Sequence, residues 1–270
     1  MASIEEKVEE YYKRKLDVLG IKHFAKNETI NKSILKSLTQ AESKSGGNGK
    51  NYPDIQLLLE DNYSRVIPVM IEAKGTKGCL EKLDKNDEII GVTLYEKDQV
   101  KKDGTITHKK GDKNYSAIAK YAVNGALHYA KAILDYSDYE EVIAVGINAF
   151  ETDYNGNVIN PECKAYYISK KNKCIPKLIV EVTPDDWSLF AESNINSLYK
   201  KLDKLSLSQA ETEKRAQILA KDLEKAVMDI HQKIYENSSF KTALLTNDKL
   251  YLFSGLIMAS MPIEGTADLT

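Results

Sequence analysis

The sequence predicts an α/β protein whose mixed central sheet carries helices on both faces, followed by an all-helical segment. Two amphipathic helical patterns come first, two strand-like runs follow, and a further helix separates these from more apolar runs. Beyond Val182 we find only helical patterns. With 270 residues, of which 42% are hydrophobic and 29% charged, the chain can bury one large core or two modest ones.

The two N-terminal helices are read from their apolar spacing. Residues 4–19 carry a helical stripe, and Ser3 stands where an N-cap belongs. The second helix is expected from about Glu28 to Glu42, with Asn27 as its cap. A glycine-containing loop, residues 43–50, then leads into the strands.

Two strands are expected to meet in a hairpin. Pro53 and Asp54 open the apolar run 55–59, and the run 66–71 continues directly into Glu72, Ala73 and Lys74. Because alternate side chains of a strand share a face, Glu72 and Lys74 should point the same way while Ala73 faces the core. The short connection 60–64 would bring Asp54 beside them.

The rest of the first part supplies further sheet and helix. Residues 80–113 are polar and irregular, with strand pieces expected at 89–95 and 104–108. A strong helix is predicted over 115–134, and Glu141 to Ala149 has the composition of a buried central strand. Shorter strands are expected at 165–169 and 178–182.

A domain boundary is expected after Val182. Proline and acidic residues at 183–187 indicate the start of a helix that runs to about Leu205. A longer helix, 211–235, has an apolar stripe, and the apolar stretch 250–261 is too short and too broken to span a membrane. The prediction is therefore one domain over 1–182 and a helical connector over 183–270.

Composition excludes several classes of protein. No run of eighteen apolar residues is present, and the acidic N-terminus is unlike a signal peptide, so a cytoplasmic location without membrane partners is expected. The three cysteines form no C-x-x-C pair and are expected to be free thiols: Cys79, Cys163 and Cys174.

Asp54, Glu72 and Lys74 carry the candidate chemistry. Two convergent carboxylates form a hard-oxygen site that suits Mg²⁺, and a nearby lysine can orient or activate a water for attack on a phosphodiester. This combination is typical of a metal-dependent nuclease. The alternative is that Glu72 and Lys74 form a surface pair and Asp54 is a turn residue after proline.

The motif of Pro53-Asp54 and Glu72-Ala73-Lys74 resembles that of the PD-(D/E)XK nuclease superfamily. The stretch from Asn27 to Gly75 is similar to the nuclease portion of type IIG and type I-like restriction enzymes. The resemblance implies a restriction-endonuclease-like core that cuts DNA. It also implies Mg²⁺, replaceable by Mn²⁺, held by Asp54, Glu72 and the backbone carbonyl of Ala73, with Lys74 positioning the attacking water.

The resemblance adds three accessory candidates. Members often carry Gln-x-x-x-Tyr on the helix after the Glu-x-Lys strand, where this chain offers Asn124 and Tyr129, five residues apart. They also often use a carboxylate from an early helix, and Glu28 is preferred here over Glu9 or Glu10. Ordinary helix packing, or for Glu28 interaction with the helix dipole, would explain the same residues.

The tail resembles the helical start of the methyltransferase portion of such enzymes. The chain has neither Asn-Pro-Pro-Tyr nor a glycine-rich cofactor loop, so methylation would need S-adenosylmethionine bound by downstream domains. The implied partners are double-stranded DNA, methyltransferase and target-recognition domains or subunits, and a transient second copy for double-strand cleavage. A non-catalytic scaffold that docks such subunits, or a repair or junction nuclease, remain the alternatives.

Charge distribution bears on DNA binding. The net charge is −2, but lysines gather in two regions, 101–113 and 164–177. Each group would either neutralise phosphates or form a solvated surface. Only three arginines occur, so we expect backbone contacts, with target recognition supplied elsewhere.

Overall fold

The computed structural model describes residues 2–60, 65–84, 89 and 93–206, and the single helical positions 221, 225, 228 and 232. The chain divides into two compact units, Met1–Leu207 and Ser208–Thr270. The four single positions fall within the expected helix 211–235. The rest of that helix and the apolar stretch 250–261 lie outside the described residues.

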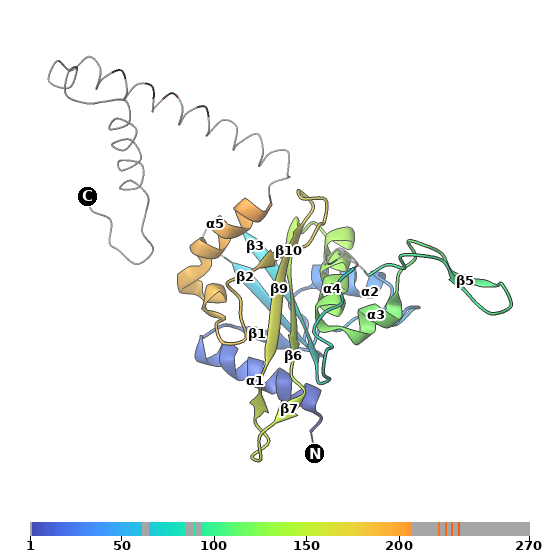
Figure 1. Ribbon diagram of the computed structural model, residues 1–270. Coiled ribbons are helices and arrows are strands. Elements are labelled where there is room, and N and C mark those ends of the chain that lie inside the picture. The colour runs from blue at the N-terminus through green and yellow to red at the C-terminus, as the bar shows by residue number, and fades with distance from the viewer. Residues whose placement is uncertain are drawn as a thin grey trace, which may run out of the picture. The chain divides into compact units, whose positions relative to one another are not determined.

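The first unit is built on a six-stranded mixed sheet (Figure 1). The strand order is β1-β2-β3-β6-β9-β10, and β3 pairs with β6 in parallel while all other pairs are antiparallel. The strands are β1 (His23–Ala25), β2 (Ile55–Glu60), β3 (Val66–Lys74), β6 (Glu141–Asn148), β9 (Glu162–Ser169) and β10 (Lys177–Ile179). The predicted α/β class with a mixed central sheet is confirmed.

Helices cover both faces of this sheet (Figure 1). One face packs against α1 (Ile4–Val18) and α5 (Ile195–Leu205), and the other against α2 (Lys32–Gln40) and α4 (Ala122–Tyr136). Successive residues of β3 alternate between the two cores, since Met70 belongs to the second while Ile71 and Ala73 belong to the first. The predicted inward position of Ala73 is therefore confirmed.

Two small hairpins and three short helical turns complete the described part of this unit. The hairpins are β4 (Gln99–Val100) with β5 (Ile106–His108), and β7 (Glu151–Thr152) with β8 (Val158–Ile159). The short helices are α3 (Tyr115–Lys120), η1 (Ser188–Phe190) and η2 (Glu192–Asn194). All three cysteines are free, as expected. In the portion of the chain that is described, no helix combines the length and apolarity needed to cross a membrane.

The first helix begins where its sequence predicts. The Ser3 hydroxyl accepts the Glu6 N–H at 3.2 Å, and the Glu6 carboxylate accepts the Ser3 N–H at 2.6 Å. This reciprocal capping box satisfies two backbone donors that the first turn would otherwise leave unpaired.

The second helix begins later than expected. Asn31, not Asn27, caps it, and its side chain accepts the Ile34 N–H at 3.0 Å. Glu28 instead lies in a turn after β1, where its carboxylate accepts the Ala25 N–H at 2.7 Å. The expected start at Glu28 is wrong because the chain first pairs β1 with β2.

The predicted helix over 115–134 is two helices. Tyr121 between α3 and α4 has extended geometry, with φ −107° and ψ 135°. The break lets the Ala122 and Val123 N–H groups donate to carbonyls of Cys79 and Leu80 at 2.9 and 2.8 Å. Donors freed at the start of α4 are thereby satisfied by the chain that follows β3.

The compact unit extends beyond the expected boundary at Val182. Trp187 and Phe190 share the first core with Val145 of β6, and α5 adds Leu198 and Leu202. Two 3₁₀ turns, rather than one continuous helix from Pro184, lead into α5.

Candidate functional site

Asp54, Glu72 and Lys74 converge at one end of the sheet, as predicted. The Asp54 N–H donates to the Ile71 carbonyl at 3.0 Å, and the Ala73 N–H donates to Asp54 Oδ2 at 2.8 Å. Lys74 Nζ donates to Glu72 Oε1 at 2.7 Å, so these two side chains share a face of β3. Both carboxylate side chains have zero exposure, so the surface-pair alternative does not hold.

Two further lysines contact the buried carboxylates. Lys26, which follows β1, donates from Nζ to Asp54 Oδ1 at 2.8 Å. Lys44, in the loop before β2, donates to Glu72 Oε1. Each buried carboxylate therefore has an ammonium partner, which offsets the free energy lost on removing it from water.

The ammonium groups are held in their charged form. Burial lowers the pKa of Lys74, but Glu72, with smaller contributions from the charges of Glu5 and Asp54, outweighs burial and leaves that pKa raised. The same competition acts on Lys26, where Asp54 outweighs burial and the pKa is again raised. Both lysines are thus hydrogen-bond donors at neutral pH.

The first helix brings two more carboxylates to Asp54. Glu5, Glu9 and Asp54 each place a carboxylate oxygen within 4.8 Å of the other two, a spacing at which three ligands can share a metal ion. Burial raises the pKa of Glu9, and the charge of Asp54 raises it further. Three carboxylates are therefore held close together at this end of α1.

Gly75 allows the first turn of α1 to approach the end of β3 closely. A Cβ atom at Gly75 would lie 2.5 Å from the backbone nitrogen of Glu5, a separation that real side chains do not show. Only a glycine at the end of β3 lets the first turn of α1 cross so closely. The residue after the Glu72-Ala73-Lys74 motif thus positions the carboxylates of α1.

One oxygen of Glu72 is weakly engaged. Its Oε2 is buried and makes no hydrogen bond of good geometry among the described residues, although the Tyr129 hydroxyl lies close enough for its interaction with Glu72 to help raise the pKa of Tyr129. Gly125 of α4 packs over the same side chain, since a Cβ there would lie 3.2 Å from Glu72 Cγ. A buried carboxylate oxygen without a well-formed hydrogen bond is uncommon in folded proteins and can accept a further donor or a cation.

Tyr129 lies at the site, whereas Asn124 does not. The Tyr129 ring faces Lys44 Nζ at 5.8 Å, and its hydroxyl donates to the Tyr52 carbonyl at 3.3 Å. Burial, together with the charges of Glu72 and Asp54, raises the pKa of Tyr129 well above its ordinary value. The phenol is therefore a neutral donor beside the carboxylates.

The Asn124 side chain serves a different part of the chain. It accepts the Lys82 N–H at 2.8 Å, and its amide donates to the Lys82 carbonyl at 3.2 Å and to the Thr93 hydroxyl at 2.6 Å. These bonds fix the chain that leads into the β4–β5 hairpin. They indicate a structural role.

The carboxylates that an early helix places beside Asp54 are Glu5 and Glu9. Glu28, the residue expected in this role, does not lie with them. Glu28 is exposed and bonds to the Ala25 backbone. The four-residue spacing of Glu5 and Glu9, which places both on one face of α1, was the available signal. That spacing is common on helices and does not by itself identify a partner strand.

The described residues therefore gather four carboxylates and three ammonium groups at one end of β3. Hard oxygen ligands of this kind suit a divalent cation such as Mg²⁺. A protein-family comparison finds no family model that matches the chain, and no match is found among curated proteins or among solved structures.

Proposed function

We propose that the protein is a Mg²⁺-dependent DNA endonuclease that hydrolyses phosphodiester bonds, as the cleavage part of a restriction-modification enzyme. One observation carries the proposal: buried Asp54 and Glu72 lie beside a protonated Lys74, and α1 brings Glu5 and Glu9 to Asp54. A structural ion pair would not need the two additional carboxylates from α1.

The donor set fits a hard divalent cation. Asp54 would hold it together with Glu5 and Glu9, whose oxygens already lie within 4.8 Å of one another, whereas Glu72, a ligand implied by the resemblance, lies outside that group. The backbone carbonyl of Ala73 is the remaining candidate ligand. When bound, Mg²⁺ or Mn²⁺ supplies Lewis-acid stabilisation of phosphate charge and lowers the pKa of a coordinated water.

Lys74 acts as a donor in this proposal. Its raised pKa keeps it protonated, so it donates a hydrogen bond to the attacking water or to a phosphate oxygen and does not remove a proton. The hydrogen bond to Glu72 Oε1 fixes its direction. Lys44 lies on the same Glu72 oxygen and adds positive charge where a phosphate would approach.

Recognition and double-strand cleavage require other components. With arginine at only three positions, we assign the nuclease unit to backbone contact and assign base recognition and methylation to partner domains or subunits. S-adenosylmethionine would act through those components alone. Two copies of the site, in a transient dimer, would cut the two strands of a duplex.

The direct test compares matched variants on supercoiled plasmid DNA with Mg²⁺. Asp54→Asn keeps the shape of the side chain but removes its charge, and Lys74→Met removes the ammonium while keeping most of the stem. Each should lower the cleavage rate at least about 100-fold, the order of effect seen when one electrostatic stabiliser is lost. Undiminished cutting by either variant would end this assignment.

Asp135→Asn is the control, because this carboxylate lies in the last turn of α4, is about half exposed and pairs with Lys131 at 3.1 Å. It should cut at the wild-type rate. Calorimetric titration of Mg²⁺ should show binding to wild-type protein and to the control, and weakened binding to Asp54→Asn.

A non-catalytic scaffold is the second candidate. The observation that favours it is that Lys26 and Lys44 already pair with both buried carboxylates. In that case Mg²⁺ would not bind to wild-type protein, and Asp54→Asn would change only the stability. The same titration separates the two candidates.

A further inference from the structure

The β4–β5 hairpin extends away from the sheet and helices (Figure 1). Every residue from 100 to 113 is exposed, so this segment contributes nothing to either core. An isolated two-stranded hairpin is marginally stable in water. Its presence therefore points to a role outside folding of the core.

Two turns of this hairpin have the same features: a lysine carbonyl accepts a backbone N–H three residues later, an aspartate accepts a backbone N–H, and a glycine has a positive φ. In the first, the Gly104 N–H donates to the Lys101 carbonyl at 3.0 Å, and Asp103 Oδ1 accepts the Thr105 N–H at 2.9 Å. Gly104 has φ +84°, a conformation that glycine adopts without strain. The turn thereby fixes the backbone next to the pair Lys101-Lys102.

The second turn lies at the other end of the hairpin. The Asp112 N–H donates to the Lys109 carbonyl at 3.1 Å, and Asp112 Oδ2 accepts the Lys109 N–H at 2.7 Å. Gly111 has φ +90°, and Asp98 accepts the Lys110 N–H at 2.7 Å. This turn likewise fixes the backbone of a second lysine pair, Lys109-Lys110.

The carboxylates of the hairpin bond to backbone, and the four turn lysines stay available. None of the ion pairs within the described ranges uses Lys101, Lys102, Lys109 or Lys110. Residues 93–113 hold six lysines against four acidic residues, a net charge of +2 in a chain whose total is −2. The segment is thus a local positive region on an otherwise acidic protein.

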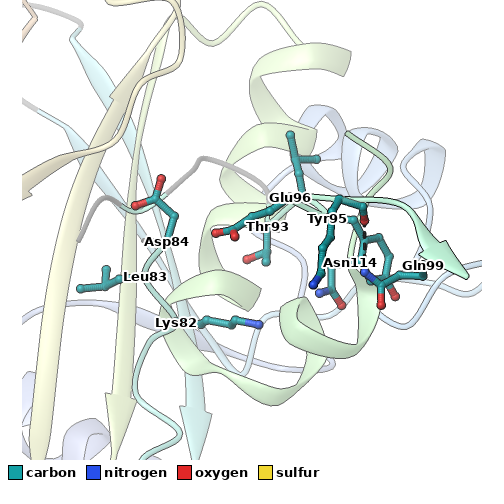
Figure 2. Close-up of a pocket in the computed structure, with 10 residues that line it drawn as sticks. Lys82, Leu83, Asp84, Thr93, Tyr95, Glu96, Gln99 and Asn114 are labelled. Atoms are coloured by element: carbon teal, nitrogen blue, oxygen red, sulfur yellow. Dashed lines mark hydrogen bonds between the residues drawn. The ribbon is translucent and has the colours of Figure 1, made fainter. Parts of the chain in front are cut away.

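The foot of the hairpin is anchored to the body of the unit through Thr93, whose hydroxyl accepts a hydrogen bond from the Asn124 amide of α4 at 2.6 Å. Within the hairpin, the Tyr95 and His108 rings stack with centroids 4.6 Å apart. A cavity of about 260 Å³ lies at this foot, and Figure 2 shows Tyr95, Gln99 and Asn114 among the residues around it. The hairpin is consequently held in place at its base.

The same foot is joined to the loop that carries Lys44. Lys113 Nζ contacts Glu42 Oε2 at 2.9 Å, and the Tyr115 hydroxyl donates to the same carboxylate. His128 Nε2 hydrogen bonds to the Glu42 carbonyl at 2.8 Å. Two residues further along the chain, Lys44 contacts Glu72.

We propose that residues 93–113 form an arm that binds the phosphate backbone of duplex DNA, with its two lysine pairs as the phosphate contacts. This inference rests on the proposed nuclease function and assigns that function a DNA-holding element. Lysine-to-phosphate contacts give affinity without base recognition, in keeping with the scarcity of arginine. Large apolar side chains on the two strands are limited to Val100 and Ile106, too few for a hydrophobic protein interface.

The test measures binding of a fluorescent 30-base-pair duplex by anisotropy, in EDTA, at several KCl concentrations. The arm variant replaces Lys101, Lys102, Lys109 and Lys110 by glutamine. Each phosphate contact contributes about 0.9 to the slope of log affinity against log salt, so loss of four lowers the slope by up to about 3.6. At about 0.1 M salt the affinity should fall on the order of tenfold or more.

The matched control replaces four exposed lysines elsewhere with glutamine. Lys171, Lys173 and Lys177 follow the Ser169 end of β9, and Lys200 lies on α5. Ser169 pairs with Glu141, whereas the candidate site lies at the Asn148 end of β6. This edge variant should keep the wild-type slope, and both variants should melt at the wild-type temperature.

Three results would contradict the proposal that residues 93–113 bind DNA. They are an unchanged salt slope in the arm variant, an equal loss of duplex affinity in the edge variant, or binding of poly-glutamate by wild-type protein as tight as its binding of the duplex. Because divalent metal is absent, this outcome does not depend on cleavage. A wild-type protein that binds the duplex through the arm but never cuts it would reject the nuclease function and leave the arm in place.

Discussion

Replacing Glu9 by glutamine should have opposite effects on stability and on metal binding. Glu9 lies with Glu5 and Asp54 in a group whose oxygens are within 4.8 Å of one another. At that separation, two carboxylates repel by about 1 to 3.5 kcal/mol for effective dielectric constants between 80 and 20. The neutral amide removes this repulsion.

One favourable contact is lost as well. Glu9 pairs with Lys13 at 3.3 Å, one helical turn away, and such pairs contribute about 0.3–0.5 kcal/mol. The net expectation is a gain of about 1 kcal/mol in the free energy of unfolding. For a unit of this size that raises the melting temperature by roughly 2–4 °C.

Metal affinity should fall in the same variant. Removal of residues that only orient metal ligands lowers affinity about 10- to 100-fold, and loss of a charged ligand should do no less. The two effects are measured by urea unfolding without metal and by calorimetric titration of Mg²⁺. A variant that is less stable than wild type, or that binds Mg²⁺ equally well, would refute the assignment of Glu9 to the site.

Glu10→Gln is the control for both measurements. Glu10 is the next residue on the same helix, but it is exposed and pairs only with Arg14, at 3.1 Å. Its replacement should change the unfolding free energy by no more than about 0.5 kcal/mol and leave Mg²⁺ affinity unchanged.

The pH dependence gives a second signature of Glu9. Its pKa is raised in the folded state, so the folded protein binds more protons than the unfolded chain as pH falls through that raised pKa. The destabilisation by ionised Glu9 is therefore full above the raised pKa and disappears below the ordinary glutamate pKa of about 4.3. The advantage of Glu9→Gln should be largest at neutral pH and vanish in acid.

Three further variants probe the supports of the site and of the hairpin. Asn124→Ala should cost about 1 kcal/mol in urea unfolding, since it leaves partly buried backbone groups of Lys82 unpaired, while Mg²⁺ affinity in a titration stays unchanged. Gly75→Ala should cost about 1–3 kcal/mol and weaken Mg²⁺ binding in a titration, whereas Gly146→Ala, with the same 2.5 Å overlap against α4, should only destabilise. Burial lowers the pKa of His128, so wild-type stability should fall as pH drops below about 6.5, and His128→Gln should flatten that dependence in unfolding curves.

The sequence alone predicts the part of the site whose residues lie close together along the chain. Asp54, Glu72 and Lys74 lie on two strands joined by a short connection, so strand alternation and hairpin pairing alone place them together. The alternation of β3 between the two cores has the same origin. Short-range geometry therefore predicts the centre of the site.

Three residues depend on long-range packing: Glu5 and Lys44, which the sequence did not reveal, and Glu9, which the sequence ranked behind Glu28. Glu5 and Glu9 reach Asp54 because Gly75 admits the first turn of α1, and no local pattern links those segments. Lys44 reaches Glu72 through a loop that the Asn51 side chain fixes, with bonds to the Leu38, Ala41 and Glu42 carbonyls. Such contacts follow from the tertiary fold and are not encoded in spacing.

The choice of Glu28 shows a different limit. Asn27 and Asn31 are both acceptable N-caps, and only the pairing of β1 with β2 decides between them. Choosing the earlier asparagine extended the helix by one turn and placed a carboxylate at its start. The short strand β1, with three residues, had no recognisable alternation.

Pairing with lysines explains how the fold tolerates the buried carboxylates of Asp54 and Glu72 without a metal ion. Asp54 and Glu72 have no exposed side-chain surface, and an unpaired buried carboxylate is strongly destabilising. Lys26 is about half exposed and Lys44 one-quarter exposed, so both ammonium groups can move to solvent without breaking the core. Lys74, at 13% exposure, is held more firmly. In the proposed nuclease, this more exposed pair would yield their places to an incoming cation, while Lys74 would stay beside Glu72.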